Sequence, residues 1–122
     1  MAAAPANADD PCLPYEPESV VLTGTAQRAF AYGPPGFGET PSKDAKEIFY
    51  SLQLAKPICV LAGDDQDEPG EPAVRQLQIA FINMPLDRSL LGQHVRVTGT
   101  LSHATTGHHH MAVLIRASAI ER

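Results

Sequence analysis

Residues 95–101 read Val-Arg-Val-Thr-Gly-Thr-Leu, so apolar and polar side chains alternate along this stretch. In an extended strand alternate residues share one face, which here would carry Val95, Val97, Gly99 and Leu101. The Val-Thr-Gly-Thr at 97–100 is echoed by Leu-Thr-Gly-Thr at 22–25. The two segments therefore predict two strands of similar pattern, each containing one glycine.

Alternation also predicts the other strands. They are expected at residues 20–26, at 48–54 with an extension at 58–61, at 77–81 and at 111–119. Pro57 interrupts the second of these, where we expect a bulge or bend. A long loop at residues 33–46 and an acidic loop at 64–71 separate the first three strands.

A short helix is predicted between the third and fourth strands. Pro85 suits a first helical turn, Leu86 and Leu90 are four residues apart, and Gly92 can end the helix. This order is that of the OB-fold. We expect a mainly β protein, a five-stranded OB-like Greek-key barrel with one short helix between strands 3 and 4. A fully antiparallel sandwich is the main alternative.

In such a barrel the first and fourth strands pair to close the sheet. A glycine in each strand, Gly24 and Gly99, would permit the sharp coiling that closure demands. The length of 122 residues allows one domain, which we place at residues 12–122. Residues 1–11 are small, Ala-rich and acidic, and are interpreted as a disordered leader.

The composition excludes several classes of function. The net charge of -5 offers no positive field to attract nucleic acid, and the longest apolar stretches are too short to insert into a membrane. An OB-fold that binds single-stranded nucleic acid remains an alternative, but it needs aromatic residues beside a basic groove. We expect Phe49, Tyr50 and Phe81 to lie in the core instead.

The two cysteines, Cys12 and Cys59, suit one disulfide that ties the start of the domain to its middle. A bridge closing a loop of about fifty residues stabilises a protein by about 4 kcal/mol in the chain-entropy model. It would favour an oxidising compartment. The alternative is two unrelated buried thiols.

Four histidines, His103, His108, His109 and His110, fall in the predicted turn between the last two strands. Zinc or copper needs three or four converging ligands, whereas consecutive strand residues point to opposite faces. Pairing His103 with His108 would gather three histidines on one face, and pairing it with His109 packs the apolar residues better. We prefer the second register, which favours a polar turn over a metal site.

Catalysis has no positive signature in this chain. The sequence contains no phosphate-binding glycine motif, no nucleophile elbow and no paired-cysteine zinc spacing. Ser102 and His103 are adjacent strand residues that point apart, so they cannot form a nucleophile and base pair. We expect no enzymatic activity.

Several segments together resemble a known family. They are residues 12–17, 21–25, 56–60, 91–101 and the Thr-Gly-His-His-His of 106–110. They resemble a family of small exported bacterial domains of unknown function, sometimes attached to lysozyme-inhibitor-like periplasmic modules, over most of residues 12–115. The resemblance implies a periplasmic or secreted location and a disulfide between Cys12 and Cys59. It supplies no activity, and Met111-Ala112 departs from the small polar residue and proline that usually follow the histidines.

The sequence thus predicts a non-catalytic exported binding module. Its binding rim would combine the 33–46 loop with the histidine turn, through Phe37, His103, Thr106 and residues 108–110. The acidic charge favours a basic protein partner, such as a secreted or cell-wall-acting protein that the domain would inhibit or confer immunity to. Binding of zinc or copper by the histidine turn is the alternative.

Overall fold

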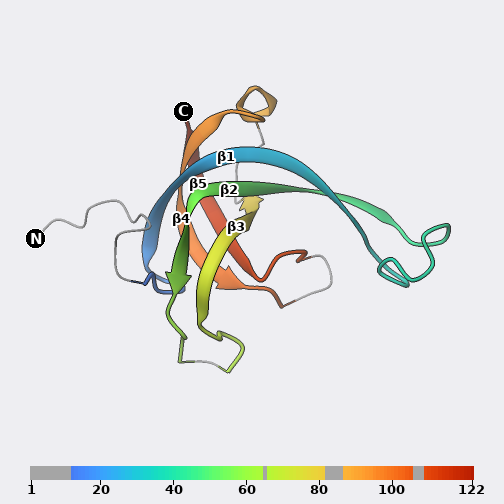
Figure 1. The fold of residues 1–122 in the computed structure, drawn as a ribbon, viewed down its shortest axis with the longest axis horizontal. Helices are drawn as coiled ribbons and strands as arrows, with labels where there is room; N and C mark the ends of the chain where they lie inside the picture. The colour runs from blue at the N-terminus through green and yellow to red at the C-terminus, as the bar shows by residue number, and fades with distance from the viewer. Residues whose placement is uncertain (1–11, 65, 82–86, 106–108) are drawn as a thin grey trace, which may run out of the picture.

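The computed structural model describes residues 12–64, 66–81, 87–105 and 109–122. Its strands are β1 (Ser19–Tyr32), β2 (Lys46–Val60), β3 (Glu71–Phe81), β4 (His94–His103) and β5 (Val113–Glu121). Figure 1 shows β1 and β2 as long curved strands that cross over the other three. The protein is mainly β, as the alternating sequence predicts.

The five strands form one sheet in the order β1-β2-β3-β5-β4, which closes into a barrel because β1 also pairs with β4. The first half of β1 pairs with β4 and its second half with β2, and Gly24 has a partner in both. β3 and β5 run parallel, whereas the other pairs are antiparallel. The expected pairing of the first and fourth strands is therefore present.

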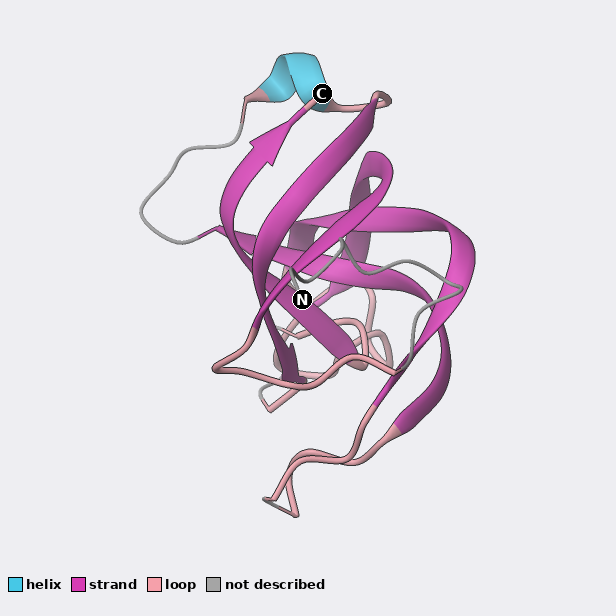
Figure 2. Ribbon diagram, turned by 90° about the vertical axis from the view of Figure 1, so that its left-hand side faces the viewer, coloured by secondary structure: helices cyan, strands magenta, loops and turns pink. Residues whose placement is uncertain are grey.

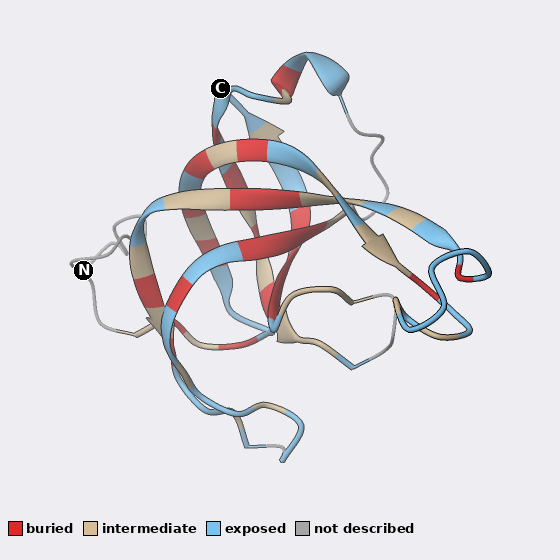
Figure 3. Ribbon diagram, turned by 45° about the vertical axis from the view of Figure 1, so that its right-hand side comes forward, coloured by how far each residue is buried: buried red, intermediate tan, exposed pale blue. Residues whose placement is uncertain are grey.

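The core lies inside the barrel and consists mainly of aliphatic side chains from all five strands, with Leu13, Tyr15 and Leu90 added from outside the strands. Leu22, Leu52, Leu77, Val97 and Ile115 are at most 1% exposed. Figure 3 shows the buried residues alternating with exposed ones along the strands around the barrel. This alternation is what a sheet with one face on the core requires.

Gly24 and Gly99 are required where neighbouring backbones approach closely. A Cβ added to Gly24 would collide with the carbonyl oxygen of Gln53 in β2, and one added to Gly99 with that of Arg116 in β5. Gly99 also lies at a shift of register between β4 and β5. The structure therefore supports the expected role of both glycines in barrel closure.

The prediction of a helix between β3 and β4 is wrong for the residues that the structure describes there. Residues 82–86, which include Pro85 and Leu86, lie outside them, and Arg88–Leu90 form one 3-10 turn. Asp87 caps this turn by accepting a hydrogen bond from the Ser89 backbone N–H, and the chain is extended again at Leu91. Figure 2 shows the turn beside the C-terminus. Within the described ranges, no helix is long and apolar enough to cross a membrane.

Neither predicted register of the last two strands is correct. His103 pairs with Val113, and Leu101 pairs with Ile115. The turn between the strands is longer than expected because β5 begins at Val113 rather than Met111. His109 and His110 therefore belong to the turn, and the argument from strand alternation does not apply to them.

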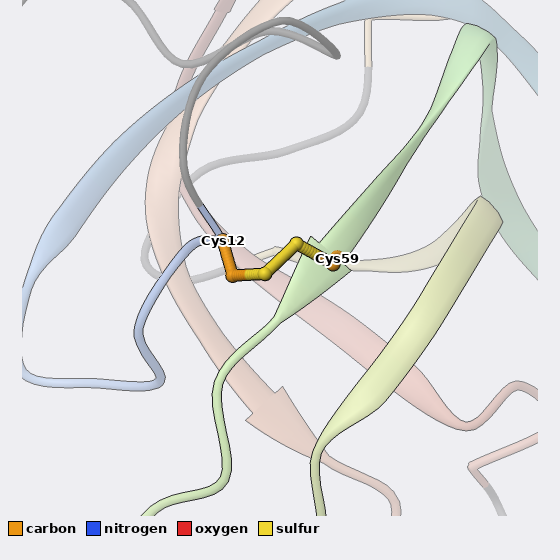
Figure 4. Close-up of a disulfide and its surroundings, with 2 residues drawn as sticks. All are labelled: Cys12 and Cys59. Carbon is orange, nitrogen blue, oxygen red and sulfur yellow. A yellow bond between two sulfur atoms is a disulfide. The ribbon is translucent and has the colours of Figure 1, made fainter.

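The disulfide between Cys12 and Cys59 is present and joins residues 47 positions apart (Figure 4). Leu13 continues the attachment, since its backbone exchanges hydrogen bonds with Cys59 and Leu61 at the end of β2. Tyr15 is buried, and its hydroxyl donates to the carbonyl oxygen of Pro69 at 2.6 Å. The segment before β1 is thus fastened to the barrel by covalent and polar contacts.

Candidate functional site

The outer halves of β1 and β2 extend beyond the barrel as a two-stranded arm. The arm comprises residues 27–32 of β1, residues 46–51 of β2 and the loop 33–45 between them, and Figure 1 shows it projecting to one side. At its inner end Tyr50 and Ser51 also pair with β3, so the arm is two-stranded from Phe49 outward. β4 stops pairing with β1 at Thr25, so only β2 accompanies β1 along the arm. The sequence predicted the loop but underestimated both strands.

The tip of the arm is held in shape by one carboxylate. Asp44 is only 7% exposed and accepts hydrogen bonds from the backbone N–H of Gly36, Gly38 and Thr40 and from the Thr40 hydroxyl, at 2.7 to 3.1 Å. The Ala45 backbone N–H adds a bond to the carbonyl oxygen of Pro34. The predicted long loop is therefore an ordered structure built around Asp44, a role that sequence reasoning missed.

Phe37 lies inside this ordered tip and faces solvent. The residue is 53% exposed, and its φ of 51° lies in the left-handed region that residues other than glycine rarely adopt. Gly38, with φ of 104°, follows it. Such a conformation persists only where its surroundings determine it, as the Asp44 hydrogen bonds do here. The tip thus holds the backbone on both sides of Phe37 and leaves its aromatic side chain exposed to solvent.

Replacing Asp44 with asparagine is expected to loosen the tip while leaving the barrel folded. Burial opposes ionisation of Asp44, but the hydrogen bonds from Thr40, Gly38 and Gly36 outweigh it, so its pKa lies below the ordinary value. The carboxylate therefore stabilises the tip above the ordinary pKa, and this stabilisation is lost as the pH falls through the lowered pKa.

Amide hydrogen exchange of Gly36, Gly38 and Thr40 measures this effect. We expect lower protection of these amides, relative to the intrinsic exchange rate at the same pH, in Asp44→Asn at neutral pH, and in the native protein only under strongly acidic conditions. Exchange in β4 and β5 is the internal control. Unchanged protection of the three amides in the variant would show that other contacts hold the tip.

The histidine turn, residues 104–112, is fastened at its start by His103. The Nε2 of His103 lies 3.0 Å from a carboxylate oxygen of Glu71, the first residue of β3. Its ring stands edge-on to Tyr15 with the centroids 6.3 Å apart. Burial, then Glu71 and Glu68, raise the pKa of Tyr15, so its hydroxyl stays a neutral donor. His103 thus joins β3, β4 and the segment before β1.

His110 fastens the other side of the turn to β2 of the arm. Its Nε2 lies 2.8 Å from a carboxylate oxygen of Glu47, and its backbone N–H donates to the side-chain oxygen of Gln78 at 2.6 Å. Its ring lies against Phe49 at a centroid distance of 4.9 Å. Phe49, expected in the core, therefore lies outside it, whereas Tyr50 packs against the core as predicted.

The histidines that the structure describes in and beside the turn do not converge on one point. His103 and His109 line a cavity of about 410 Å³, together with Ser102, Thr105, Leu114 and Arg116. His110 turns instead toward Glu47 in β2, and Thr106 and His108 lie outside the described residues. Among the residues that are described, no group of three or more His, Cys, Asp or Glu side chains is placed to hold a metal ion.

These features define a small, disulfide-bonded β domain with a projecting arm and an anchored histidine turn. Residues 76–121 match the family described as Domain of unknown function (DUF4431), which confirms the resemblance to a family of domains of unknown function. The match extends from β3 to β5 and contains the histidine turn. Comparisons with curated proteins and with solved structures found no match.

Proposed function

We propose that this protein is an exported, non-catalytic binding module that inhibits, or confers immunity to, a basic secreted or cell-wall-acting protein. The contact surface comprises the tip of the arm, with Phe37 at its centre, and the adjacent histidine turn. The ordered, exposed Phe37 is the observation that carries the proposal. An exposed aromatic side chain on a backbone that is ordered before binding is suited to anchor a protein interface.

The strand order supports an OB-like barrel as the scaffold. A closed five-stranded sheet in the order β1-β2-β3-β5-β4 is what the OB-like Greek key requires, and the segment between β3 and β4 contains only a 3-10 turn where the helix was expected. OB-folds bind ligands through the loops after β1 and after β4. Here these are the arm tip and the histidine turn, and the Glu47–His110 contact brings the turn against β2 close to where this strand leaves the tip loop.

The disulfide and the negative net charge of the domain support a basic, secreted protein as the partner. The disulfide favours export to an oxidising compartment. A net charge of -5 would attract a basic protein and speed its encounter with the domain. In addition, His103 is engaged with Glu71 and His110 with Glu47, which favours a structural role of these imidazoles over catalysis or metal binding.

Substituting Phe37 with alanine is expected to weaken binding to the partner by at least about tenfold, because removal of an interface anchor costs more than 1.4 kcal/mol. A basic muramidase is the first probe, with inhibition of cell-wall lysis and direct binding as the readouts. Basic proteins captured from periplasmic extract extend the search if this enzyme is not inhibited.

Leu61→Ala is the matched control for this experiment. Leu61 is 52% exposed, almost the same as Phe37, but lies after β2 beside the attachment of Leu13. We expect Leu61→Ala to bind as the native protein does. Equal losses in the two variants, or full binding by Phe37→Ala, would contradict the assignment of the arm tip as the contact surface.

A further inference from the structure

The arm leaves one edge of β1 open. Along residues 27–32, β1 pairs with β2 on one side. On its other side, Ala26 exchanges the last backbone hydrogen bonds, donating to Gln93 and accepting from Gly92. Beyond Ala26, no strand in the described part of the chain pairs with this edge. An open strand edge is a template for pairing with another strand.

The backbone groups that face this open edge belong to Arg28, Phe30 and Tyr32. The N–H and C=O of Ala26 both point toward the β4 side. Because these groups alternate between the two edges along an antiparallel strand, residues two, four and six positions later point the same way. Three residues therefore offer six hydrogen-bonding groups to an incoming strand.

The same three residues share one face of the arm with side chains of β2. In the register of the two strands Arg28 lies opposite Tyr50, Phe30 opposite Ile48 and Tyr32 opposite Lys46. Phe30 is 48% exposed and Ile48 is 49% exposed, and the rings of Phe30 and Tyr32 meet edge-to-face at 5.0 Å. Two large apolar side chains thus face solvent beside the open edge.

The sequence at this edge, Arg-Ala-Phe-Ala-Tyr at residues 28–32, complements itself when a second copy runs antiparallel. With Phe30 opposite Phe30 of the second copy, Arg28 lies opposite Tyr32, and Ala29 lies opposite Ala31. A guanidinium then meets an aromatic ring on each side of a central aromatic pair, and like charges do not face each other. In this register the outward-facing N–H and C=O groups of Arg28, Phe30 and Tyr32 lie opposite the same groups of the second copy and can hydrogen-bond with them.

We propose that the protein forms a symmetric dimer through antiparallel addition of the β1 edge of the arm to the same edge of a second copy. The two arms join into one four-stranded sheet, centred on Phe30, with Ile48 of each copy covering the aromatic pair. The arm tip with Phe37 and the histidine turn stay outside the contact. The dimer therefore presents two copies of the proposed binding surface.

Light scattering after size-exclusion chromatography, and sedimentation from micromolar to submillimolar concentration, test this proposal with the whole chain. We expect the native protein to reach the mass of a dimer. The dissociation constant of the dimer should rise at least tenfold in Phe30→Ala and in Arg28→Glu. Both native residues are exposed, so we expect these substitutions to leave the barrel folded. Phe37→Ala should dimerise normally, which separates this contact from partner binding. A monomer throughout the concentration range would overturn the proposal.

Cross-linking tests the register independently. In the proposed register residue 29 lies opposite residue 31 of the second copy, and the Cα atoms of such a pair are about 4.5 Å apart, within reach of a disulfide. A mixture of Ala29→Cys and Ala31→Cys should therefore form a covalent dimer on oxidation, visible on a non-reducing gel, and both changes keep Phe30 and Arg28. Ala29→Cys alone should not cross-link, because residue 29 does not lie opposite itself. Efficient cross-linking of Ala29→Cys alone, or none in the mixture, would show that this edge does not pair in the proposed register.

Discussion

Replacing Gly99 with alanine is expected to destabilise the barrel by about 3 kcal/mol or more, the upper part of the range for overpacked sites. The added Cβ would point at the carbonyl group of Arg116 in β5, and its third neighbour is the Cα of Ala117. All of these are backbone atoms, so no side chain can move aside. β4 and β5 would have to separate at the place where their register shifts. Chemical denaturation followed by circular dichroism measures the loss.

Substitutions of two other glycines provide comparisons for this prediction. Gly24→Ala should be similarly harmful, because its Cβ would meet the backbone of Gln53. Gly92→Ala should cost only about 1 kcal/mol, since its Cβ would find open space and only its φ of 79° disfavours a side chain. A variant Gly99→Ala no less stable than Gly92→Ala would mean that the barrel can relax at this contact.

Removing the disulfide is expected to lower the free energy of unfolding by about 4 kcal/mol, because the bridge closes a loop between residues 47 positions apart. The double variant Cys12→Ser with Cys59→Ser tests this in urea. The loss should also appear in the native protein after reduction. This loss is a large fraction of the free energy of unfolding of a typical domain, which is about 5–15 kcal/mol.

The double serine variant supplies its own control, because a reductant should not change its unfolding midpoint. Hydrogen exchange at the Leu13 amide, which donates to the Cys59 carbonyl, shows whether the segment before β1 stays attached. A loss of less than about 1 kcal/mol would mean that the Leu13 backbone bonds and the burial of Tyr15 hold the segment without the bridge.

The sequence predicted those features that depend on residues close together in the chain. Alternation of apolar residues located all five strands, and the Thr-Gly-Thr echo identified the two glycines at which backbones approach closely. The cysteine pair was also inferred correctly. The expected helix was wrong because two leucines four residues apart are compatible with several conformations, and the Asp87 cap begins a shorter turn.

The candidate site was harder to predict. Phe37 was chosen as a loop residue, but the sequence does not show that Asp44 holds the backbone on both sides of it, because an aspartate in a polar loop is usually solvated. The histidine turn was located correctly, yet its partners Glu47 and Glu71 are 63 and 32 residues away. Acidic residues so distant in the chain give no local signal of pairing with histidine.

The sequence by itself determined which segments are strands, where the chain turns and which glycines and cysteines the fold needs. These properties follow from the period of the side chains and from local conformational preferences. Only the tertiary structure decided the register of β4 and β5, the length of the arm, its open edge and the partners of the histidines. A register depends on the packing of strands that are far apart in the chain. A shift by an even number of residues, such as that from Met111 to Ile115 opposite Leu101, keeps the same side chains on the core face, so alternation does not distinguish the two registers.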